Sequence, residues 1–400
     1  MHRLIILSLF LPFICRSADA SDTIDGYMNR FIIEHRVPGA SVAISRDGKL
    51  LYAKGYGWAD KKARAIVKPN SLFRIASISK PITAVAIMQL VESGKLNLTD
   101  CLVDHLESME HYRRHEGYDP RIEDITIHDL LRHSGGWDRS KDFDPMGREG
   151  HLRVAKMGIY PPVETRDVIA FMFRRPLQFD PGTRSAYSNF GYLLLGRVIE
   201  DVTGKKYEPY VKRYVLAPLG ITTMQVGFME RERRAENEVT YYDHKHRTAP
   251  APYGRLQGRE VPYPYARPMQ FMDAHGGWIA SAPDLVRFAD NLHKLLKPET
   301  IQTMFARQPG LLGHDANARE KAAFYALGWM VRPQANGANH WHGGLIQGTS
   351  TLLVRRHDGY RWAILFNTSS NPENQTLSGL IDGPFHGLVS SVDNWTQKGR

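Results

Sequence analysis

Two Asp-Gly turns, one near each end of the chain, constrain its fold more than any other feature. The first is Asp47-Gly48 and the second is Asp358-Gly359; the apolar runs that flank them are 41–45 and 50–56, then 349–355 and 360–367. Asp-Gly between apolar runs is typical of a β-hairpin, because this pair readily adopts the positive φ angles of a tight turn. The sequence therefore predicts antiparallel strands at both chain ends.

Between these hairpins the chain has mostly helical and loop patterns. Apolar spacing near 3.6 residues, with Gly or Pro at the ends, predicts helices at 24–36, 78–93, 127–133, 161–174, 190–203 and 209–216, and the tail 376–392 is mixed and also fits a helix. The fold class predicted is α+β: one antiparallel sheet built from both chain ends, flanked by helices, with a mostly helical insertion at roughly 95–272.

The stretch Thr240 to Pro268 differs from the rest. Tyrosines alternate there with prolines, which excludes a regular helix. Ordered loops of this length are often functional, so a lid or pocket wall is one interpretation. A surface excursion packed on its own aromatic rings is the other, and the sequence leaves both open.

The first twenty residues have the pattern of a signal peptide. A short basic start is followed by the apolar run Leu4 to Ile14 and by the small residues of Ala18-Asp19-Ala20. We expect cleavage after Ala20, one hydrolase domain over 21–400 and a secreted or periplasmic protein. The chain has two cysteines, and cleavage would remove Cys15 and leave Cys101 as a single thiol, so no internal disulfide is expected.

Composition argues against several other classes of protein. The net charge is +10, but the 52 Lys and Arg do not cluster, which favours a solvated basic surface over a nucleic-acid footprint. His244-Lys245-His246 has no third ligand at a suitable spacing for a metal ion. No later run is long and apolar enough for a transmembrane helix. We expect no metal, no cofactor, no nucleic-acid partner and no transmembrane anchor.

The chemistry centres on Ser77-Ile78-Ser79-Lys80, at the start of an apolar helix. Residues three apart on a helix share a face, so the Ser77 hydroxyl should lie beside the Lys80 amine. Pro81 is tolerated in the first helical turn. A serine hydroxyl needs a base to become a nucleophile, and a buried lysine with a lowered pKa can be that base. Because Ser-x-x-Lys alone is a weak motif, its context must support it.

A second group follows the turn Pro181-Gly182-Thr183 and precedes a helix: Tyr187-Ser188-Asn189. A tyrosine here could share the proton with Lys80, and Asn189 could hold a substrate amide or the lysine itself. Tyr27-Met28-Asn29 has the same spacing, but it lies on the amphipathic N-terminal helix, so we interpret Tyr27 as a core residue.

The third group should lie on a strand edge and offer a polar side chain and a backbone N–H. His342-Gly343-Gly344, followed by Leu345, precedes the last two strands, and its glycines would let a substrate approach the backbone closely. Other His-x-Gly sequences occur, and His275-Gly276-Gly277 is a real competitor. We prefer His342 because only it precedes the final hairpin.

These residues, in this order, resemble the serine β-lactamase and penicillin-binding protein superfamily, with class C β-lactamases, D-Ala-D-Ala carboxypeptidases and β-lactamase-like esterases as the most similar groups. Residues 130–136 and 276–281 also match the family's phrases. The resemblance implies that Ser77 is acylated and that Lys80 and Tyr187 act as general base and acid. It also implies that Asn189 positions substrate and that the N–H groups of Ser77 and Leu345 bind the oxyanion.

The chain departs from the family at the third group. Many members have Lys-Thr-Gly where this chain has His342-Gly343-Gly344, and histidine is a weaker, pH-dependent cation. The sequence therefore predicts a serine hydrolase for a small-molecule or peptide ester or amide. The alternatives are a D-Ala-D-Ala carboxypeptidase, a β-lactamase proper, or a non-catalytic binding or scaffold protein of the same fold.

Overall fold

A computed structural model describes residues 20–392 and Trp395, except for 107–108, 115, 157–162 and 253. The predicted signal peptide, residues 1–20, lies outside the described residues apart from Ala20. No helix in the described part of the chain is long and apolar enough to cross a membrane.

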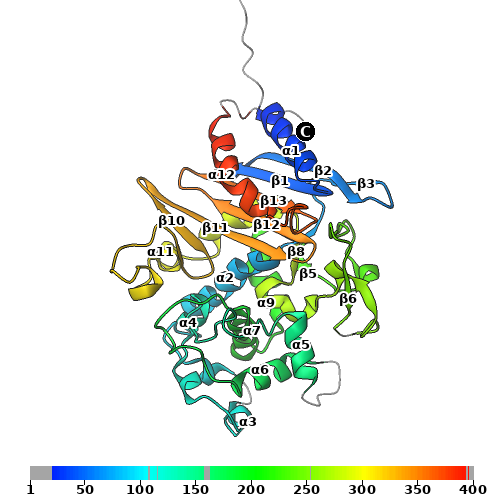
Figure 1. The fold of residues 1–400 in the computed structure, drawn as a ribbon. Coiled ribbons are helices and arrows are strands. Elements are labelled where there is room, and N and C mark those ends of the chain that lie inside the picture. Colours follow the sequence, from blue (N-terminus) through cyan, green and yellow to red (C-terminus); the bar gives the residue numbers. More distant parts are fainter. Residues whose placement is uncertain are drawn as a thin grey trace, which may run out of the picture.

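An eight-stranded antiparallel sheet is the centre of the fold (Figure 1), with the strand order β3-β2-β1-β13-β12-β11-β10-β9. Strand β1 from the N-terminal hairpin pairs directly with β13 from the C-terminal hairpin, with Ala43 opposite Ala363. The predicted sheet from both chain ends is therefore confirmed. The strands are β1 (Gly39–Arg46), β2 (Lys49–Asp60), β3 (Ala65–Ile66), β9 (Phe324–Tyr325), β10 (Met330–Gln334), β11 (Gly337–Ile346), β12 (Thr349–Arg355) and β13 (Tyr360–Phe366).

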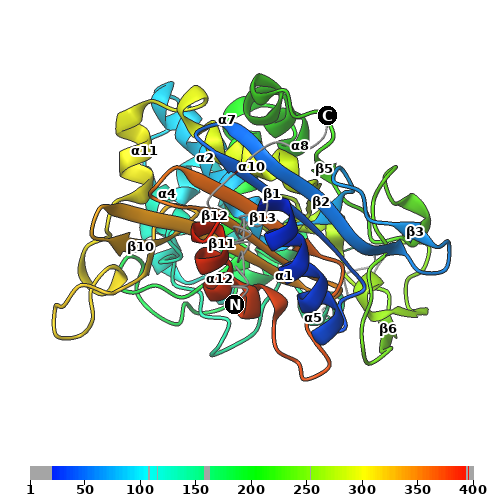
Figure 2. The same ribbon diagram turned by 90° about the horizontal axis from the view of Figure 1, so that it is seen from above.

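Two helices from opposite chain ends, α1 (Ala20–Glu34) and α12 (Leu377–Ser390), cover one face of the sheet (Figure 2). Met28 and Phe31 of α1 join Phe385 of α12 and Trp362 of β13 in one buried apolar cluster. Tyr27 also packs in this layer, against Phe31 and Phe385, as expected for a core residue.

A larger core fills the other face, between the sheet and the remaining helices. Helix α2 (Ser79–Glu92) lies at its centre. It is buried over most of its length, because apolar side chains occur on every side of the helix. The other helices are α3 (Met109–Arg113), α4 (Ile127–Leu131), α5 (Arg148–Ala155), α6 (Thr165–Phe173), α7 (Asn189–Thr203), α8 (Tyr207–Val211), α9 (Asp273–Gly276), α10 (Ala282–Asp290) and α11 (Pro298–Phe305). The predicted helical insertion at 95–272 stays a prediction.

The Tyr- and Pro-rich segment 240–268 contains two short paired strands, β6 (Thr248–Pro250) and β7 (Glu260–Pro262), and the 3₁₀ turn η7 (Tyr263–Tyr265). No regular helix occurs among its described residues, as its prolines predict. Tyr241 and Tyr265 contact each other and both lie against the buried Arg74 guanidinium. Three more short strands, β4 (Phe73–Arg74), β8 (Trp278–Ala280) and β5 (Gln225–Val226), form a separate sheet beside α2.

The edge of β11 lies against the 3₁₀ turn η1 (Ala76–Ile78), and Gly344 packs closely against the start of this turn. A Cβ added at Gly344 would lie 2.2 Å from the Ile75 carbonyl oxygen and 2.2 Å from Thr351 Oγ1. Thr351 Oγ1 in turn donates a hydrogen bond of 3.0 Å to the same carbonyl. A side chain at Gly344 would therefore separate β11 from η1.

We predict that Gly344→Ala lowers the free energy of unfolding by about 1–3 kcal/mol, the usual cost of overpacking a filled site. The matched control is Gly343→Ala, where an added Cβ would meet nothing closer than the Thr351 carbonyl at 3.7 Å. Urea unfolding of both variants measures the difference. Equal stability of the two would contradict this account of the β11–η1 contact.

Candidate active site

Ser77 lies in η1, two residues before α2 begins at Ser79, and Lys80 is the second residue of α2. Their side chains meet as the spacing predicts: Lys80 Nζ lies 3.1 Å from Ser77 Oγ. The residue before Ser77 has a strained backbone, because Ala76 has φ of +47°. Left-handed backbone at a residue other than glycine is uncommon and gathers at functional sites.

The Lys80 side chain is fully buried. In addition to its contact with Ser77, Nζ lies at 2.8 Å from two acceptors, Asn189 Oδ1 and the His275 carbonyl oxygen, and donates a hydrogen bond to each. Loss of water around the amine lowers the pKa of Lys80 well below its usual 10.5, although the Asp144 carboxylate acts in the opposite direction. Burial therefore favours the neutral amine at this position.

The Asn189 amide has a fixed orientation. Its Nδ2 donates a hydrogen bond of 2.5 Å to Asp144 Oδ2, and an ionised carboxylate can only accept. The Oδ1 of Asn189 must then face Lys80. Asp144 also pairs with Arg139, at 3.7 Å. Asp144 and Arg139 lie on the loop between α4 and α5, and no sequence signal marked either residue.

The hydrogen bonds around Lys80 fit a neutral amine. The Asn189 and His275 oxygens are both acceptors only, so they take the two N–H bonds of an –NH₂ group. The nitrogen lone pair is then left for Ser77 Oγ, which has a proton to give. Lys80 Nζ is therefore a base beside the Ser77 hydroxyl, and among these contacts its lone pair has no other partner.

Tyr187 comes two residues before Asn189, where the chain enters α7. Ser188 caps this helix by accepting a hydrogen bond of 3.2 Å from the Gly191 N–H. The Lys80 amine lies 4.8 Å from the centre of the Tyr187 ring, and the Arg139 guanidinium lies 4.7 Å from it. Burial raises the pKa of the Tyr187 phenol, while a hydrogen bond with Ser77 lowers it, and the net direction is upward. Tyr187 is therefore protonated at neutral pH.

The His133 ring packs against the ring of Tyr187. Its ring lies 4.2 Å from the Tyr187 ring, centre to centre, and its Nδ1 accepts a hydrogen bond from the Ser188 N–H at 3.2 Å. His133 is buried and has φ of +62°. The sequence marked this residue as part of a phrase shared with the family and as one of several His-x-Gly sequences, and its contact with Tyr187 depends on the tertiary fold.

His342 lies on β11 and is buried. Its Nδ1 is 2.8 Å from the Gly343 carbonyl oxygen, so this nitrogen must be the donor. The other nitrogen, Nε2, then accepts from the Tyr325 hydroxyl at 3.0 Å. Burial and the neighbouring Lys80 lower the pKa of His342 from 6.5 to about 3. His342 is thus a neutral hydrogen-bonding group at pH 7, and it stays neutral well below pH 6.5, where an ordinary histidine becomes the cation that the sequence suggested.

His275 was the alternative to His342 for the third group, and it lies on the short helix α9. It contributes its carbonyl oxygen to Lys80, while its imidazole is buried. The two histidines therefore occupy different positions around the same lysine, and only His342 lies on a strand edge.

Leu345 lies on the part of β11 that has one free edge. Pairing with β10 ends at Trp341, whereas pairing with β12 continues to Ile346. In an antiparallel ladder, alternate residues direct their N–H groups to opposite sides. Ile346 and Thr349 flank a two-residue turn, which makes them a hydrogen-bonded pair. The N–H group of the neighbouring Leu345 is therefore directed away from β12. This is the edge that lies beside η1.

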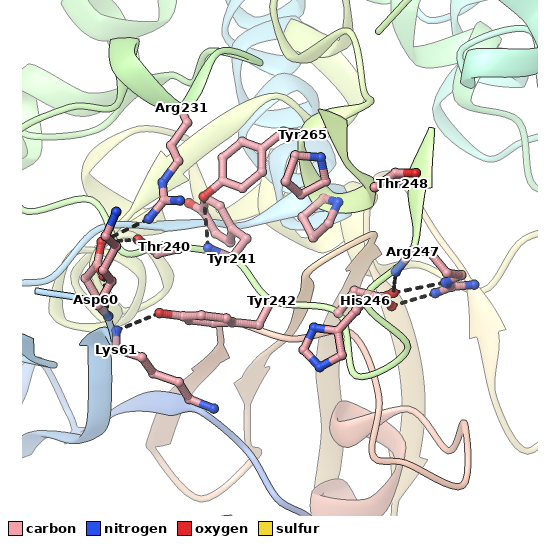
Figure 3. A pocket seen from close by; sticks show the side chains of 14 residues that line it. Asp60, Lys61, Arg231, Thr240, Tyr241, Tyr242, His246, Arg247, Thr248 and Tyr265 are labelled. Atoms are coloured by element: carbon pink, nitrogen blue, oxygen red, sulfur yellow. Dashed lines mark hydrogen bonds and ion pairs between the residues drawn. The ribbon is translucent and has the colours of Figure 1, made fainter. Parts of the chain in front are cut away.

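A separate cavity of about 350 Å³ lies on the Tyr- and Pro-rich segment (Figure 3), and none of Ser77, Lys80 or Tyr187 lines it. Its walls include Tyr242 and Tyr265, and its carboxylates are already paired, Asp60 with Arg231 and Asp243 with Arg247. No group of three or more potential metal ligands occurs in the described part of the chain.

The comparisons with known proteins identify the family and the fold. Residues 20–382 match the family model described as Beta-lactamase. The chain is 27% identical to the mouse "Serine beta-lactamase-like protein LACTB, mitochondrial", over 82% of this chain and 71% of that protein. It is 30% identical to "Esterase EstB" of Burkholderia gladioli, over 68% of this chain and 64% of the esterase, so it spans less than two thirds of that relative.

A solved structure with a similar fold is the octameric penicillin-binding protein homologue from Pyrococcus abyssi. The TM-score is 0.68 at 27% identity, and the match covers 91% of this chain and 77% of that one.

The buried histidines predict a loss of stability in acid. An unfolded His342 takes up a proton near pH 6.5, whereas the folded protein resists protonation down to about pH 3. Below pH 6.5 the unfolded state therefore binds more protons, and stability falls as the pH falls, by up to about 1.4 kcal/mol per pH unit for each such group.

We predict that His342→Gln reduces the drop in melting temperature between pH 7.5 and pH 5.0. His246→Gln, at an exposed position, is the control and should leave that drop as in the wild type. An identical drop in all three proteins would contradict the neutral, buried His342.

Proposed function

Because the chain belongs to the Beta-lactamase family, we propose that it is a serine hydrolase that cleaves an ester or small amide through an acyl-enzyme on Ser77. The observation that supports this most strongly is the contact between the buried Lys80 amine and Ser77 Oγ, at 3.1 Å. A hydroxyl with a neutral amine beside it has the base that nucleophilic attack requires.

In the first step Lys80 takes the hydroxyl proton while Ser77 Oγ forms a bond to the substrate carbonyl carbon. The carbonyl π electrons move to its oxygen. The N–H groups of Ser77 and Leu345 bind that oxyanion, since Leu345 lies on the free edge of β11 next to η1. Donors held in place in this way stabilise charge that develops only in the transition state.

In the second step the bond to the leaving group breaks, and the leaving group receives the proton from Lys80 through the Tyr187 hydroxyl. The raised pKa of Tyr187 supports this role, because a phenol that stays protonated can donate one proton while it accepts another. Water then attacks the acyl-enzyme with Lys80 as its base, which releases the acid and restores Ser77.

Three alternatives differ in substrate or in activity. A D-Ala-D-Ala carboxypeptidase or a β-lactamase would gain from a cation at position 342, and His342 is neutral. A scaffold protein would have no need for the hydrogen bonds that join Asp144, Asn189 and Lys80 to Ser77. An ester hydrolase needs this arrangement and needs no cation at position 342.

We predict that Ser77→Ala abolishes both ester turnover and labelling by a fluorophosphonate probe, without a change in melting temperature. Lys80→Ala and Tyr187→Phe should each lower kcat by roughly 10²-fold or more, the usual scale for general acid–base groups. Ser79→Ala is the matched control and should still label, because the Ser79 hydroxyl donates to the Ala76 carbonyl at 2.7 Å. Full labelling of a folded Ser77→Ala variant would place the nucleophile elsewhere.

We predict that the wild type has a higher kcat/KM for 4-nitrophenyl butyrate than for the cephalosporin nitrocefin. A neutral His342 cannot form the charge-assisted hydrogen bond to a substrate carboxylate that lysine forms, which contributes about 1.5–3 kcal/mol. Since about 1.4 kcal/mol is a factor of ten, His342→Lys should raise the nitrocefin-to-ester ratio about tenfold or more. A faster wild-type reaction with nitrocefin, or no change of the ratio in His342→Lys, would refute the prediction.

A further inference from the structure

Arg267 lies at the end of the free edge of β11 that is farther from His342. It is a cation without a paired carboxylate in the described part of the chain. It lies between η7 and the 3₁₀ turn η8 (Met269–Met272), and its Nε donates to the side-chain oxygen of Gln347, in the β11–β12 turn. A Cβ added at Gly147, just before α5, would lie 3.9 Å from Arg267 Nη1. The guanidinium therefore lies between the β11–β12 turn and the loop that contains Asp144.

No carboxylate in the described part of the chain forms an ion pair with Arg267. Asp144 is the carboxylate that acts on it most, and it is already bonded to Asn189 and Arg139. Arg267 is half-buried, and burial lowers the pKa of its guanidinium from 12.5. Arginine does not lose its proton in proteins, so a half-buried guanidinium without a paired carboxylate is a favourable place for a bound anion.

Arg267 shares a cavity of about 320 Å³ with Leu345, Ile346 and Gln347 of the β11–β12 hairpin. Tyr263 forms part of the wall, and its hydroxyl accepts a hydrogen bond of 3.2 Å from Gln347 Nε2. Arg247 also lines this cavity, but its guanidinium is held by Asp243. Of the two arginines that line this cavity, Arg267 is thus the one without a paired carboxylate in the described part of the chain.

The orientation of the bound substrate along β11 follows from the proposed path of the proton. The leaving group must lie beside Tyr187, whose ring is 6.5 Å from the His342 ring, near the middle of β11. The acyl group must extend the other way from the carbonyl carbon, past Leu345 toward Gln347. Two residues of strand span about 7 Å, so an acyl chain of about six carbons reaches from the Leu345 N–H to Gln347.

We propose that Arg267 is a specificity-determining residue that binds a carboxylate at the far end of the substrate's acyl chain. The preferred substrates are then monoesters or monoamides of dicarboxylic acids, an assignment that rests on the proposed function. This carboxylate differs in place from the one that a lysine at position 342 would bind, because the two positions lie at opposite ends of the free edge of β11.

The test compares mono-4-nitrophenyl adipate with 4-nitrophenyl hexanoate, which share chain length and leaving group and differ in the terminal carboxylate. The wild type should have the higher kcat/KM for the adipate, after subtraction of the uncatalysed rate. Arg267→Met should lower the adipate-to-hexanoate ratio about tenfold or more, and Arg267→Lys should retain part of it. Arg247→Met, in the same cavity, is the matched control and should change the ratio less than about twofold.

A wild-type preference for the hexanoate would overturn the proposal. So would an equal loss on both esters in Arg267→Met, because that result is expected of a purely structural arginine. The proposed function fails separately: neither ester is then cleaved, and Ser77 does not react with the fluorophosphonate. If the hexanoate is cleaved through Ser77 without any preference for the adipate, only the assignment of Arg267 is wrong.

Discussion

The burial of the Lys80 amine is the constraint on which the rest of this site depends. Lys80 Nζ has no contact with water and lies within hydrogen-bond distance of three oxygen atoms, from Ser77, Asn189 and the His275 main chain. A charged ammonium is costly in such a place, and none of these three oxygens is ionised. The neutral form that results is the form able to take a proton from Ser77.

The fold supplies these oxygen atoms from segments far apart in the chain. Ser77 and Lys80 come from η1 and α2, Asn189 from the start of α7, and the His275 carbonyl from α9. The strand edge of β11 closes the site from the C-terminal part of the sheet, and Gly344 lets it approach η1. Because β1 pairs with β13, the sheet that contains this edge is built from both ends of the chain.

The sequence predicts the local parts of this arrangement well. The Asp-Gly turns locate the hairpins, and the spacing of Ser77 and Lys80 places both side chains together, since one helical turn determines their distance. Tyr187 and Asn189 follow from their place at a helix start. The sequence could not identify Asp144, which orients Asn189, because an acidic residue on a loop has no pattern of its own. It could not show that His342 stays neutral far below pH 6.5, since the burial that lowers its pKa is a property of the packed protein.

The most direct test of the neutral Lys80 is the pH dependence of the rate at which an uncharged fluorophosphonate inactivates the enzyme. We predict that the rate rises with pH through one ionisation well below 10.5. We also predict that Asp144→Asn moves this midpoint to lower pH, because that change removes the carboxylate that favours the ammonium while an amide oxygen can still accept from Asn189. A midpoint near 10.5, or one that stays in place or moves upward in Asp144→Asn, would contradict the account.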